Sequence, residues 1–202
     1  GESGSGKSSL MSIFFFFFEP DHVRLDINGQ SSTTLAPLFD MTTLLPQEPE
    51  IFENTIGYNI TVGIDCPVEE VMQAVRLACF DRVLDRLPNG LNTDVRERGV
   101  TLSGGERQRL ALARGILAAR DSTIILMDEP TSSVDAHNEM TIYENIFDHF
   151  KNATIISSIH RLHLLNKFDQ VVVMDQGRIV QVGTFDDLKS QPGLFQKLWD
   201  KY

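Results

Sequence analysis

The sequence has few cysteines and no long hydrophobic segment. Its two cysteines, Cys66 and Cys79, lack the spacing of metal ligands, and we expect two reduced, buried thiols of a cytosolic protein. The longest uninterrupted apolar run covers residues 13–18, whereas spanning a bilayer takes roughly 20 residues, so we expect no membrane-spanning segment. No signal peptide is recognisable at the N-terminus.

Basic residues are also scarce. Lys and Arg number 18 against 28 Asp and Glu, and the formal net charge is −10. Bulk electrostatics therefore give no attraction for a phosphate backbone, and we expect no nucleic-acid partner, although a local basic groove would suffice for one. The chain has no initiator Met, and we expect a piece of a longer protein. Its 202 residues, 42% of them apolar, fit one domain or one core with a subdomain.

Residues 1–9, GESGSGKSS, fit the phosphate-binding loop pattern of Gly, four residues and Gly-Lys-Ser. The glycines let several backbone N–H groups point into one concavity that an anion can fill. Lys7 adds a cation for the β- and γ-phosphates, and the Ser8 hydroxyl can ligate Mg²⁺. The helix expected from Lys7 adds the positive end of its dipole. A flexible Gly/Ser linker is the alternative, but it needs no Lys-Ser leading into an apolar run.

Periodicity and turn residues predict an alternation of helices and strands. We expect helices over about 7–18, 68–87, 103–119 and 194–202, another capped by residues 184–187, strands over 23–27, 42–45, 123–127 and 153–158, and a hairpin over 171–182. The first helix should end before Pro20 and contains five consecutive phenylalanines, residues 14–18. A helix that is apolar all round must be buried all round.

Residues 103–109, SGGERQR, open the helix expected through about Ala119. Ser103 and Glu106 form a capping box on structural grounds alone. The box does not explain Gly104 and Gly105, each of which costs roughly 1 kcal/mol in a helix relative to Ala. Small residues there indicate that something approaches the backbone closely, and a helix N-terminus suits a phosphate.

Polar residues follow three of the predicted strands. Asp128 and Glu129 end the apolar strand over 123–127, where two adjacent carboxylates are costly unless they have a function. Asp128 is suited to hold Mg²⁺, and Glu129 to orient and deprotonate a water. Gln47 follows the strand over 42–45, at a position where ligands bind in open α/β sheets. His160 follows the strand over 153–158 and can hydrogen-bond a γ-phosphate.

Together these pieces resemble the ATP-binding domain of an ABC transporter over nearly the whole chain. Residues 1–9 resemble the Walker A loop, residues 102–108 (LSGGERQ) the family signature, 123–129 the Walker B strand with its catalytic glutamate, and 132–135 the D-loop. Gln47 resembles the Q-loop glutamine and His160 the switch histidine. The stretches 52–60 and 93–99 look like those of exporters, where the second contacts coupling helices of the membrane domain. The departures are Phe14–Phe18, Ser9, Val23, Val134 and Ser158, and none removes a catalytic group.

The resemblance implies a nucleotide-binding α/β core with a mostly parallel sheet, N-terminal strands missing, and a helical subdomain over about 49–117 within a single domain of residues 1–202. Its implied catalytic residues are Glu129 and His160, and its implied metal ligands for Mg²⁺ are Ser8, Gln47 and Asp128. The implied ATP-binding residues are Gly1, Ser3, Gly4, Ser5, Gly6, Lys7, Ser8, Ser9, Gln47, Ser103, Gly104, Gly105, Glu106 and Asp135.

The implied function is ATP hydrolysis that drives export, at the cytoplasmic face of a membrane. The implied partners are the transmembrane domain of the same transporter and a second ATP-binding domain in a head-to-tail dimer. The alternative is a soluble ABC ATPase of DNA repair or translation, a class that usually has large insertions or tandem ATPase units. A third class, an inert interaction module, is disfavoured by the intact Lys7, Asp128, Glu129 and His160.

Overall fold

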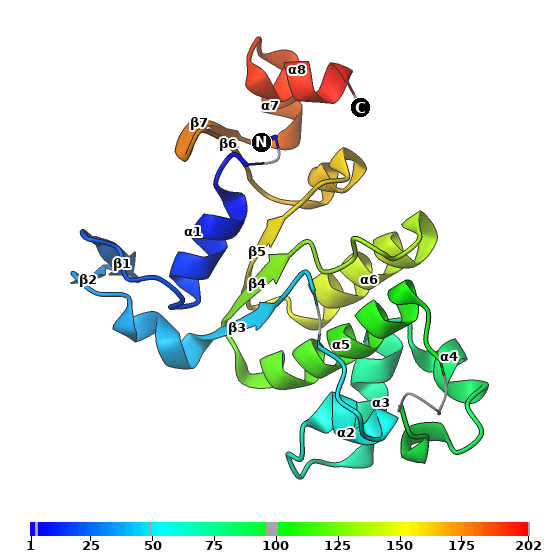
Figure 1. Cartoon of the computed structure of the whole chain (residues 1–202). Coiled ribbons are helices and arrows are strands. Elements are labelled where there is room, and N and C mark those ends of the chain that lie inside the picture. The colour runs from blue at the N-terminus through cyan, green and yellow to red at the C-terminus, as the bar shows by residue number, and fades with distance from the viewer. Residues whose placement is uncertain (3, 49, 96–100, 202) are drawn as a thin grey trace. The chain divides into compact units, whose positions relative to one another are not determined.

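The computed structural model describes residues 1–2, 4–48, 50–95 and 101–201. By its internal contacts the chain divides into two compact units. Unit 1 comprises Gly1–Phe39 and Ser157–Tyr202, and unit 2 comprises Asp40–Ile156. Both units contain helices and strands (Figure 1), so the predicted α/β class is confirmed.

The strands of unit 1 form two antiparallel pairs, β1 (Leu25–Ile27) with β2 (Gln30–Ser32) and β6 (Val171–Asp175) with β7 (Arg178–Gly183). The turn residues Asn28 and Gly29 have φ of 52° and 81°, and Gln176 and Gly177 have φ of 47° and 74°. Two consecutive positive φ values characterise the type I′ turn, whose twist matches that of the strands it joins. The hairpin predicted over 171–182 is confirmed, and the strand predicted over 23–27 is in fact the first strand of a second hairpin.

The first helix, α1 (Lys7–Phe14), is shorter than predicted, and the extension to Phe18 is wrong. The Phe16 N–H donates to the Ile13 carbonyl at 3.1 Å, and the Phe17 N–H donates to the Ser12 carbonyl at 2.9 Å. With Phe16 at a φ of 65°, these two bonds form a Schellman motif, which ends a helix at a left-handed residue. Glycine is usual at that position, so a phenylalanine there does not indicate the early end of the helix.

The phenylalanines beyond α1 are not buried on all sides. Phe17 and Phe18 are 63% and 64% exposed, and Phe39 is 68% exposed. The Phe16 ring packs at 5.4 Å from that of Phe39. The expectation of an all-round buried helix over 14–18 is therefore wrong, because most of the run lies outside the helix.

The C-terminal part of unit 1 has its own small core. The helices α7 (Phe185–Ser190) and α8 (Leu194–Asp200) contact each other and β7. Thr184 caps α7, since its hydroxyl accepts the Asp187 N–H at 3.2 Å, as predicted. The buried members of this core are Val171, Val173, Leu188 and Phe195, with Phe185 and Trp199 packed against them.

Unit 2 contains a three-stranded sheet in the order β3, β4, β5 (Figure 1). β3 (Thr42–Leu45) and β4 (Ile124–Asp128) run parallel, with Leu45 opposite Met127. β5 (Thr154–Ser158) lies next to β4, and its last two residues, Ser157 and Ser158, belong to unit 1. The three central residues of β4 are at most 1% exposed, as predicted for a strand buried on both faces.

The rest of unit 2 is mostly helical. The described α-helices of unit 2 are α2 (Ile56–Thr61), α3 (Val68–Leu77), α4 (Asp81–Asp85), α5 (Gly104–Ala118) and α6 (Ala136–His149). α5 contacts β3 as well as α2 and α3 (Figure 1). The contact with β3 is close, since a Cβ on Gly115 would lie 2.8 Å from Leu45 Cγ. Short 3₁₀ turns complete the described elements: η1 (Ala36–Met41), η2 (Gly90–Asn92), η3 (Ala119–Asp121) and η4 (Leu162–Lys167).

The single helix predicted over 68–87 is in fact two helices. α3 ends in a second Schellman motif, in which Cys79 has a φ of 54° and the Phe80 N–H donates to the Val75 carbonyl at 2.9 Å. Phe80 is fully buried beyond the break. Cys79 and Cys66 are free and half-buried, so the expectation of buried thiols is wrong in degree. Burial, followed by the nearby Asp81, raises the pKa of the Cys79 thiol.

The helical subdomain predicted over about 49–117 stays a prediction. Helices α2, α3, α4 and α5 fall almost wholly within that range. The residue at its first boundary, Pro49, lies outside the described residues. So does Tyr202, the last residue of the predicted C-terminal helix.

Candidate functional site

The glycine-rich loop of unit 1 curls around the ammonium group of Lys7. Lys7 Nζ donates to the carbonyl oxygens of Gly1 and Glu2 at 3.0 Å each and lies 3.5 Å from Ser5 Oγ. Gly4 has a φ of 79°, a left-handed value that only glycine adopts without strain. The loop thus has the tight curvature that the phosphate-binding pattern requires. The predicted ligand residue Ser3 lies outside the described residues.

The N-terminus of α1 has no side-chain cap. Its N-cap residue, Gly6, has a φ of 99° and no side chain that could accept a bond from the first turn. The first turn also contains no acidic residue, and Ser8 and Ser9 are exposed there. Uncapped N–H groups and the positive end of the dipole make this helix end suited to an anion.

The turn of the β6–β7 hairpin braces the glycine-rich loop within unit 1. The Gly177 N–H donates to the Ser5 carbonyl at 3.0 Å. A Cβ on Gly6 would lie 3.2 Å from Gly177 Cα, so the two backbones meet where glycine alone fits comfortably. His160, the predicted switch histidine, belongs to the same unit, is exposed and comes two residues after β5, as expected from the sequence.

In unit 2 the predicted catalytic carboxylate and the Q-loop glutamine meet. Asp128 ends β4, and Glu129 follows it with a φ of 47°. Gln47 follows the parallel neighbour β3 by two residues, and its Nε2 donates to Glu129 Oε2 at 3.1 Å. The amide therefore fixes one carboxylate oxygen of Glu129. Both Asp128 and Glu129 are half-buried.

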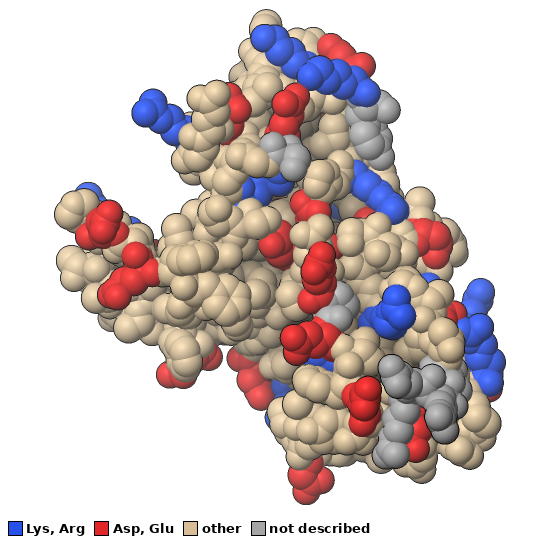
Figure 2. All heavy atoms as spheres, in the orientation of Figure 1, with Lys and Arg blue, Asp and Glu red and all other residues tan. Residues whose placement is uncertain are grey.

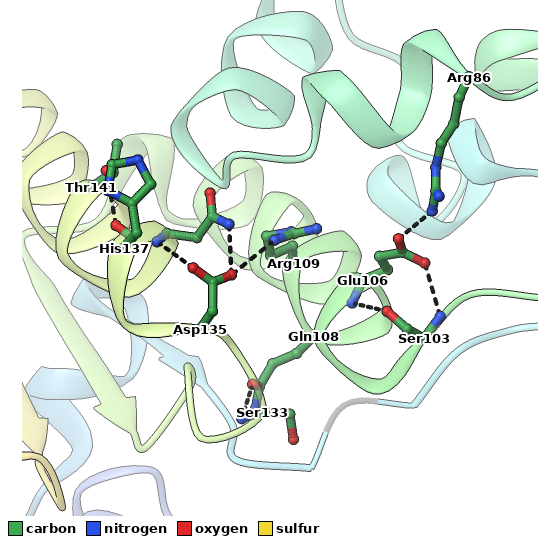
Figure 3. A network of polar contacts seen from close by, with 10 residues as sticks. Arg86, Ser103, Glu106, Gln108, Arg109, Ser133, Asp135, His137 and Thr141 are labelled. Atoms are coloured by element: carbon green, nitrogen blue, oxygen red, sulfur yellow. Dashed lines mark hydrogen bonds and ion pairs between the residues drawn. The ribbon is translucent and has the colours of Figure 1, made fainter.

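The predicted capping box at the start of α5 is confirmed. The Glu106 N–H donates to Ser103 Oγ at 3.3 Å, and the Ser103 N–H donates to Glu106 Oε2 at 2.9 Å (Figure 3). The Arg86 guanidinium, just past α4, binds the other oxygen of Glu106. Burial alone would raise the pKa of Glu106, but the Ser103 N–H and Arg86 outweigh it, and the pKa is lowered.

The two glycines of α5 differ in what surrounds them. A Cβ on Gly105 would lie 2.8 Å from the backbone oxygen of Ser133, whereas a Cβ on Gly104 would meet nothing nearer than Ser133 Cβ at 3.9 Å. The close approach inferred from the sequence is therefore made at Gly105 by the chain's own D-loop. Gly104 is exposed and has no such contact, and its predicted role in phosphate binding stays a prediction.

Asp135 caps α6. Its carboxylate accepts the Asn138 N–H at 3.0 Å and the Asn138 side-chain amide at 2.7 Å, and Arg109 lies 3.9 Å away (Figure 3). The Asn138 side chain and then its N–H lower the pKa of Asp135. A capping role explains the carboxylate, so its predicted part in nucleotide binding stays a prediction.

The structure brings the two exporter-like stretches together. Thr55 and Asp94 form an antiparallel bridge, and the Ile56 N–H donates to the Thr93 carbonyl at 2.9 Å. Arg114 of α5 places its guanidinium 4.7 Å from the centre of the Phe52 ring. Residues 96–99 of the second stretch lie outside the described residues.

Sequence reasoning missed Arg86 and Gln108. Arg86 gave no signal, because it lay inside what was predicted as one continuous helix. Gln108 gave one: it is four and eight residues from Leu112 and Ile116, which places a polar side chain on the buried stripe of α5.

Known proteins resemble this chain. A family model described as ABC transporter matches residues 1–132. The chain belongs to the ABC transporter family. Its resemblance to this family, inferred from the glycine-rich loop and the signature segment, is confirmed.

Its relatives include ABC exporters. The chain is 39% identical over 203 residues to the mitochondrial iron–sulfur clusters transporter ABCB7 of Homo sapiens, covering 98% of this chain and 27% of the relative. It is 37% identical over 201 residues to the glutathione/L-cysteine transport system ATP-binding/permease protein CydC of Bacillus subtilis, covering 98% of this chain and 35% of that protein. The chain thus spans about a third or less of the length of these relatives. The relatives favour the transport class over the soluble ABC ATPases.

A solved structure gives the same family. A bacterial Atm1-family ABC exporter with ATP bound matches with a TM-score of 0.88 and 37% identity, over 100% of this chain and 35% of that one. The predicted ABC ATPase fold is confirmed by this match. In the described part of this ABC transporter chain, none of the helices has the length and apolarity to cross a membrane.

Acidic and basic side chains are interspersed on the face shown in Figure 2. Among the described residues, no cluster of three or more His, Cys, Asp and Glu could hold a metal ion. Mg²⁺ is commonly held by one or two carboxylates together with substrate phosphates, so the predicted role of Asp128 as a ligand of this ion stays a prediction.

Proposed function

We propose that this chain binds and hydrolyses ATP and that hydrolysis drives export by the protein that carries it. One observation supports the hydrolytic part most strongly. The Glu129 carboxylate follows a buried parallel strand, and one of its oxygens accepts a hydrogen bond from Gln47 Nε2, 3.1 Å away, which orients the carboxylate. Family membership and the exporter relatives support the transport part.

In this proposal the nucleotide phosphates bind the glycine-rich loop. Lys7 supplies the cation and the uncapped N-terminus of α1 supplies N–H donors. Ser8, Gln47 and Asp128 provide the oxygen ligands for Mg²⁺, which when bound neutralises phosphate charge. His160 donates a hydrogen bond to the γ-phosphate.

Glu129 acts as the general base. Its carboxylate takes the proton of the attacking water, and Gln47 holds it in orientation. Both of these side chains belong to unit 2, at the ends of parallel neighbouring strands. Glu129 must lie within hydrogen-bond distance of the attacking water to take its proton, so an orientation fixed by Gln47 supports the chemistry.

The direct test replaces Glu129 with Gln in the protein that carries this chain. The amide keeps the shape but cannot accept a proton, so kcat should fall by about 10²–10⁴-fold while ATP still binds. Glu69→Gln, an exposed glutamate at the start of α3, is the matched control. Wild-type turnover by Glu129→Gln would remove Glu129 from the role of base.

The proposed assembly is a head-to-tail pair of ATP-binding domains attached to the transmembrane domain of the same transporter, at the cytoplasmic face of the membrane. Residues 103–106 of one copy would contact the nucleotide of the other. The adjoining stretches around Thr55 and Asp94 are proposed to contact the transmembrane domain, as the family resemblance implies.

Sedimentation in the Glu129→Gln background tests the pairing. ATP should promote dimer formation, and Ser103→Arg should abolish the dimer because a long cation would fill the contact, while leaving ATP binding by each copy intact. If turnover per chain is independent of concentration and Ser103→Arg is fully active, the shared site is refuted.

A further inference from the structure

Gln108 is a buried polar side chain on a helix face that otherwise consists of apolar residues. It lies on α5, four residues before Leu112 on the same stripe, and is 4% exposed. A buried amide without partners is costly, so its hydrogen bonds define what it does.

The Gln108 amide bonds to two loops of unit 2. Its Nε2 donates to the Gln47 carbonyl at 3.2 Å and to Ser132 Oγ at 3.0 Å. Its Oε1 accepts the Ser133 N–H at 2.7 Å (Figure 3). The orientation of the amide is determined chemically, because a backbone carbonyl only accepts and a backbone N–H only donates. A flipped amide would face both with the wrong atom.

The two loops are the ones that hold the Gln47–Glu129 pair. Gln47 presents its side chain to Glu129 and its backbone to Gln108. The turn bonded to Gln108 begins at Glu129, whose carbonyl accepts the Ser132 N–H at 3.2 Å. One amide therefore fastens the backbone on both sides of the catalytic contact.

The turn after Glu129 has a second buried anchor. Thr131 Oγ1 donates to Glu139 Oε1 of α6 at 2.7 Å, and both residues are at most 3% exposed. Thr131 is thus bonded to α6 and Ser133 to α5. Of these two anchors, Gln108 is the one that also bonds to the backbone of Gln47.

We propose that Gln108 is a positioning residue for hydrolysis, which sets the distance between Gln47 and Glu129 by bonding the Gln47 backbone and the turn after Glu129 to the signature helix. The proposal rests on the proposed ATPase function. Because Gln108 acts through other residues, its loss should lower kcat and leave ATP affinity nearly unchanged.

Two variants separate the bonds. Gln108→Met keeps an unbranched side chain of similar size and loses both the donor and the acceptor. Gln108→Glu still accepts the Ser133 N–H but turns a carboxylate toward the Gln47 carbonyl. Gln73→Met, at an exposed glutamine of α3, is the matched control. Melting curves of all variants check that each chain is folded.

We expect Gln108→Met to lower kcat by about 10²-fold, the effect of a displacement near 1 Å at a catalytic group, with KM for ATP within about twofold of wild type. Gln108→Glu should also lower kcat. Adding Gln47→Ala to Gln108→Met should cost no more than Gln47→Ala alone, because the two residues act on the same contact. Additive losses would overturn the proposal.

Amide hydrogen exchange of the full chain gives a readout that needs no turnover. The Ser133 amide should exchange about tenfold faster in Gln108→Met, as expected for a lost hydrogen bond, and should keep its protection in Gln108→Glu. If the wild type does not hydrolyse ATP, the proposed function fails, and exchange alone decides whether Gln108 holds the turn. If the wild type hydrolyses ATP and Gln108→Met behaves like Gln73→Met, the positioning proposal fails alone.

Discussion

Two helices of this chain begin at glycine-rich sequences that both suggest phosphate binding, yet their N-termini differ. α1 starts at Gly6 with no side-chain cap and no acidic residue in its first turn. α5 starts at Ser103 with a complete capping box, and the carboxylate of that box also binds Arg86. Glycines stand at the start of both helices, but only α5 is capped by the side chain of its own N-cap residue.

A glycine-rich sequence at the start of a helix therefore does not by itself make an anion-binding site. At α1 the uncapped N–H groups and Lys7 both favour a negative ligand. At α5 the Glu106 carboxylate already occupies the positive end of the dipole and bonds to the Ser103 N–H. The α1 end is suited to bind an anion within one chain. In the proposed head-to-tail pair, the α5 end would complete a site whose main contacts are made by the glycine-rich loop of the other copy.

Among these predictions, Lys7→Ala should change ATP binding the most, because Lys7 lies at the α1 end that is suited to an anion. Lys7→Ala removes the cation of the loop and should weaken ATP binding about a hundredfold, as expected for the loss of hydrogen bonds to a charged group. Titration with a fluorescent ATP analogue measures it, and Lys151→Ala at an exposed lysine is the control. Equal affinities of Lys7→Ala and wild type would contradict the phosphate role of the loop.

The next largest effect should be on stability, and it should differ between the two glycines of α5. Gly105→Ala drives a Cβ to 2.8 Å from the Ser133 backbone oxygen and should destabilise the chain by about 1–3 kcal/mol. Gly104→Ala meets nothing so close and should be neutral or stabilising by up to about 1 kcal/mol. Urea unfolding compares them. Equal stabilities would show that Ser133 yields to the added methyl group.

Serine-to-alanine variants at the N-termini of α5 and α1 should have a smaller effect on stability. Ser103→Ala should cost about 1 kcal/mol, because the hydroxyl that accepts the Glu106 N–H is lost. Ser9→Ala, at an exposed serine in the first turn of α1, should change stability by less than about 0.5 kcal/mol, because Gly6 and not Ser9 is the N-cap there. Thermal unfolding of both variants measures the two stability changes. A loss of stability in Ser9→Ala as large as that in Ser103→Ala would contradict the prediction.

The smallest effect is the response of the α5 cap to acid. The pKa of Glu106 is lowered in the folded chain, so its stabilising contribution is present above the ordinary glutamate pKa of about 4.3 and is lost as the pH falls through the folded value. The stability difference between wild type and Glu106→Gln, about 0.3–1 kcal/mol at neutral pH, should therefore shrink in acid. A difference that grows as the pH falls would have the wrong sign.

The sequence predicted elements best where turn residues carry the information. The hairpin over 171–182 was predicted from the glycine after Gln176, because Gln176 and Gly177 adopt the left-handed values of a type I′ turn. The buried strand β4 was located by its continuous apolar run. The order of the glycine-rich loop, the signature segment and the strand that ends in two carboxylates was enough to predict the family.

Helix ends were predicted poorly, for a physical reason. α1 and α3 both end in Schellman motifs whose left-handed residues are Phe16 and Cys79 rather than glycine. A left-handed non-glycine residue costs roughly 1–2 kcal/mol locally, which tertiary contacts must offset. The buried ring of Phe80 after Cys79 supplies such a contact. No local sequence pattern predicts this contact, so the helix end could not be predicted either.

At the candidate site, the residue types could be predicted from the sequence, whereas their bonding partners are seen in the structure. Glu129 and Gln47 were both predicted, but their contact required the register of β3 on β4. Gly105 was read as room for a ligand, although the nearest atom to it belongs to Ser133. Pairings between distant segments are set by packing, which one-dimensional patterns do not encode.

The bond from the Gly177 N–H to the Ser5 carbonyl joins residues 172 positions apart in the chain. A ribosome makes the glycine-rich loop early and the β6–β7 turn late. The loop therefore lacks one support of its curvature until nearly the whole chain has been synthesised, and contacts of such sequence separation form slowly. The glycine-rich loop is therefore translated well before the hairpin turn that completes its hydrogen bonding.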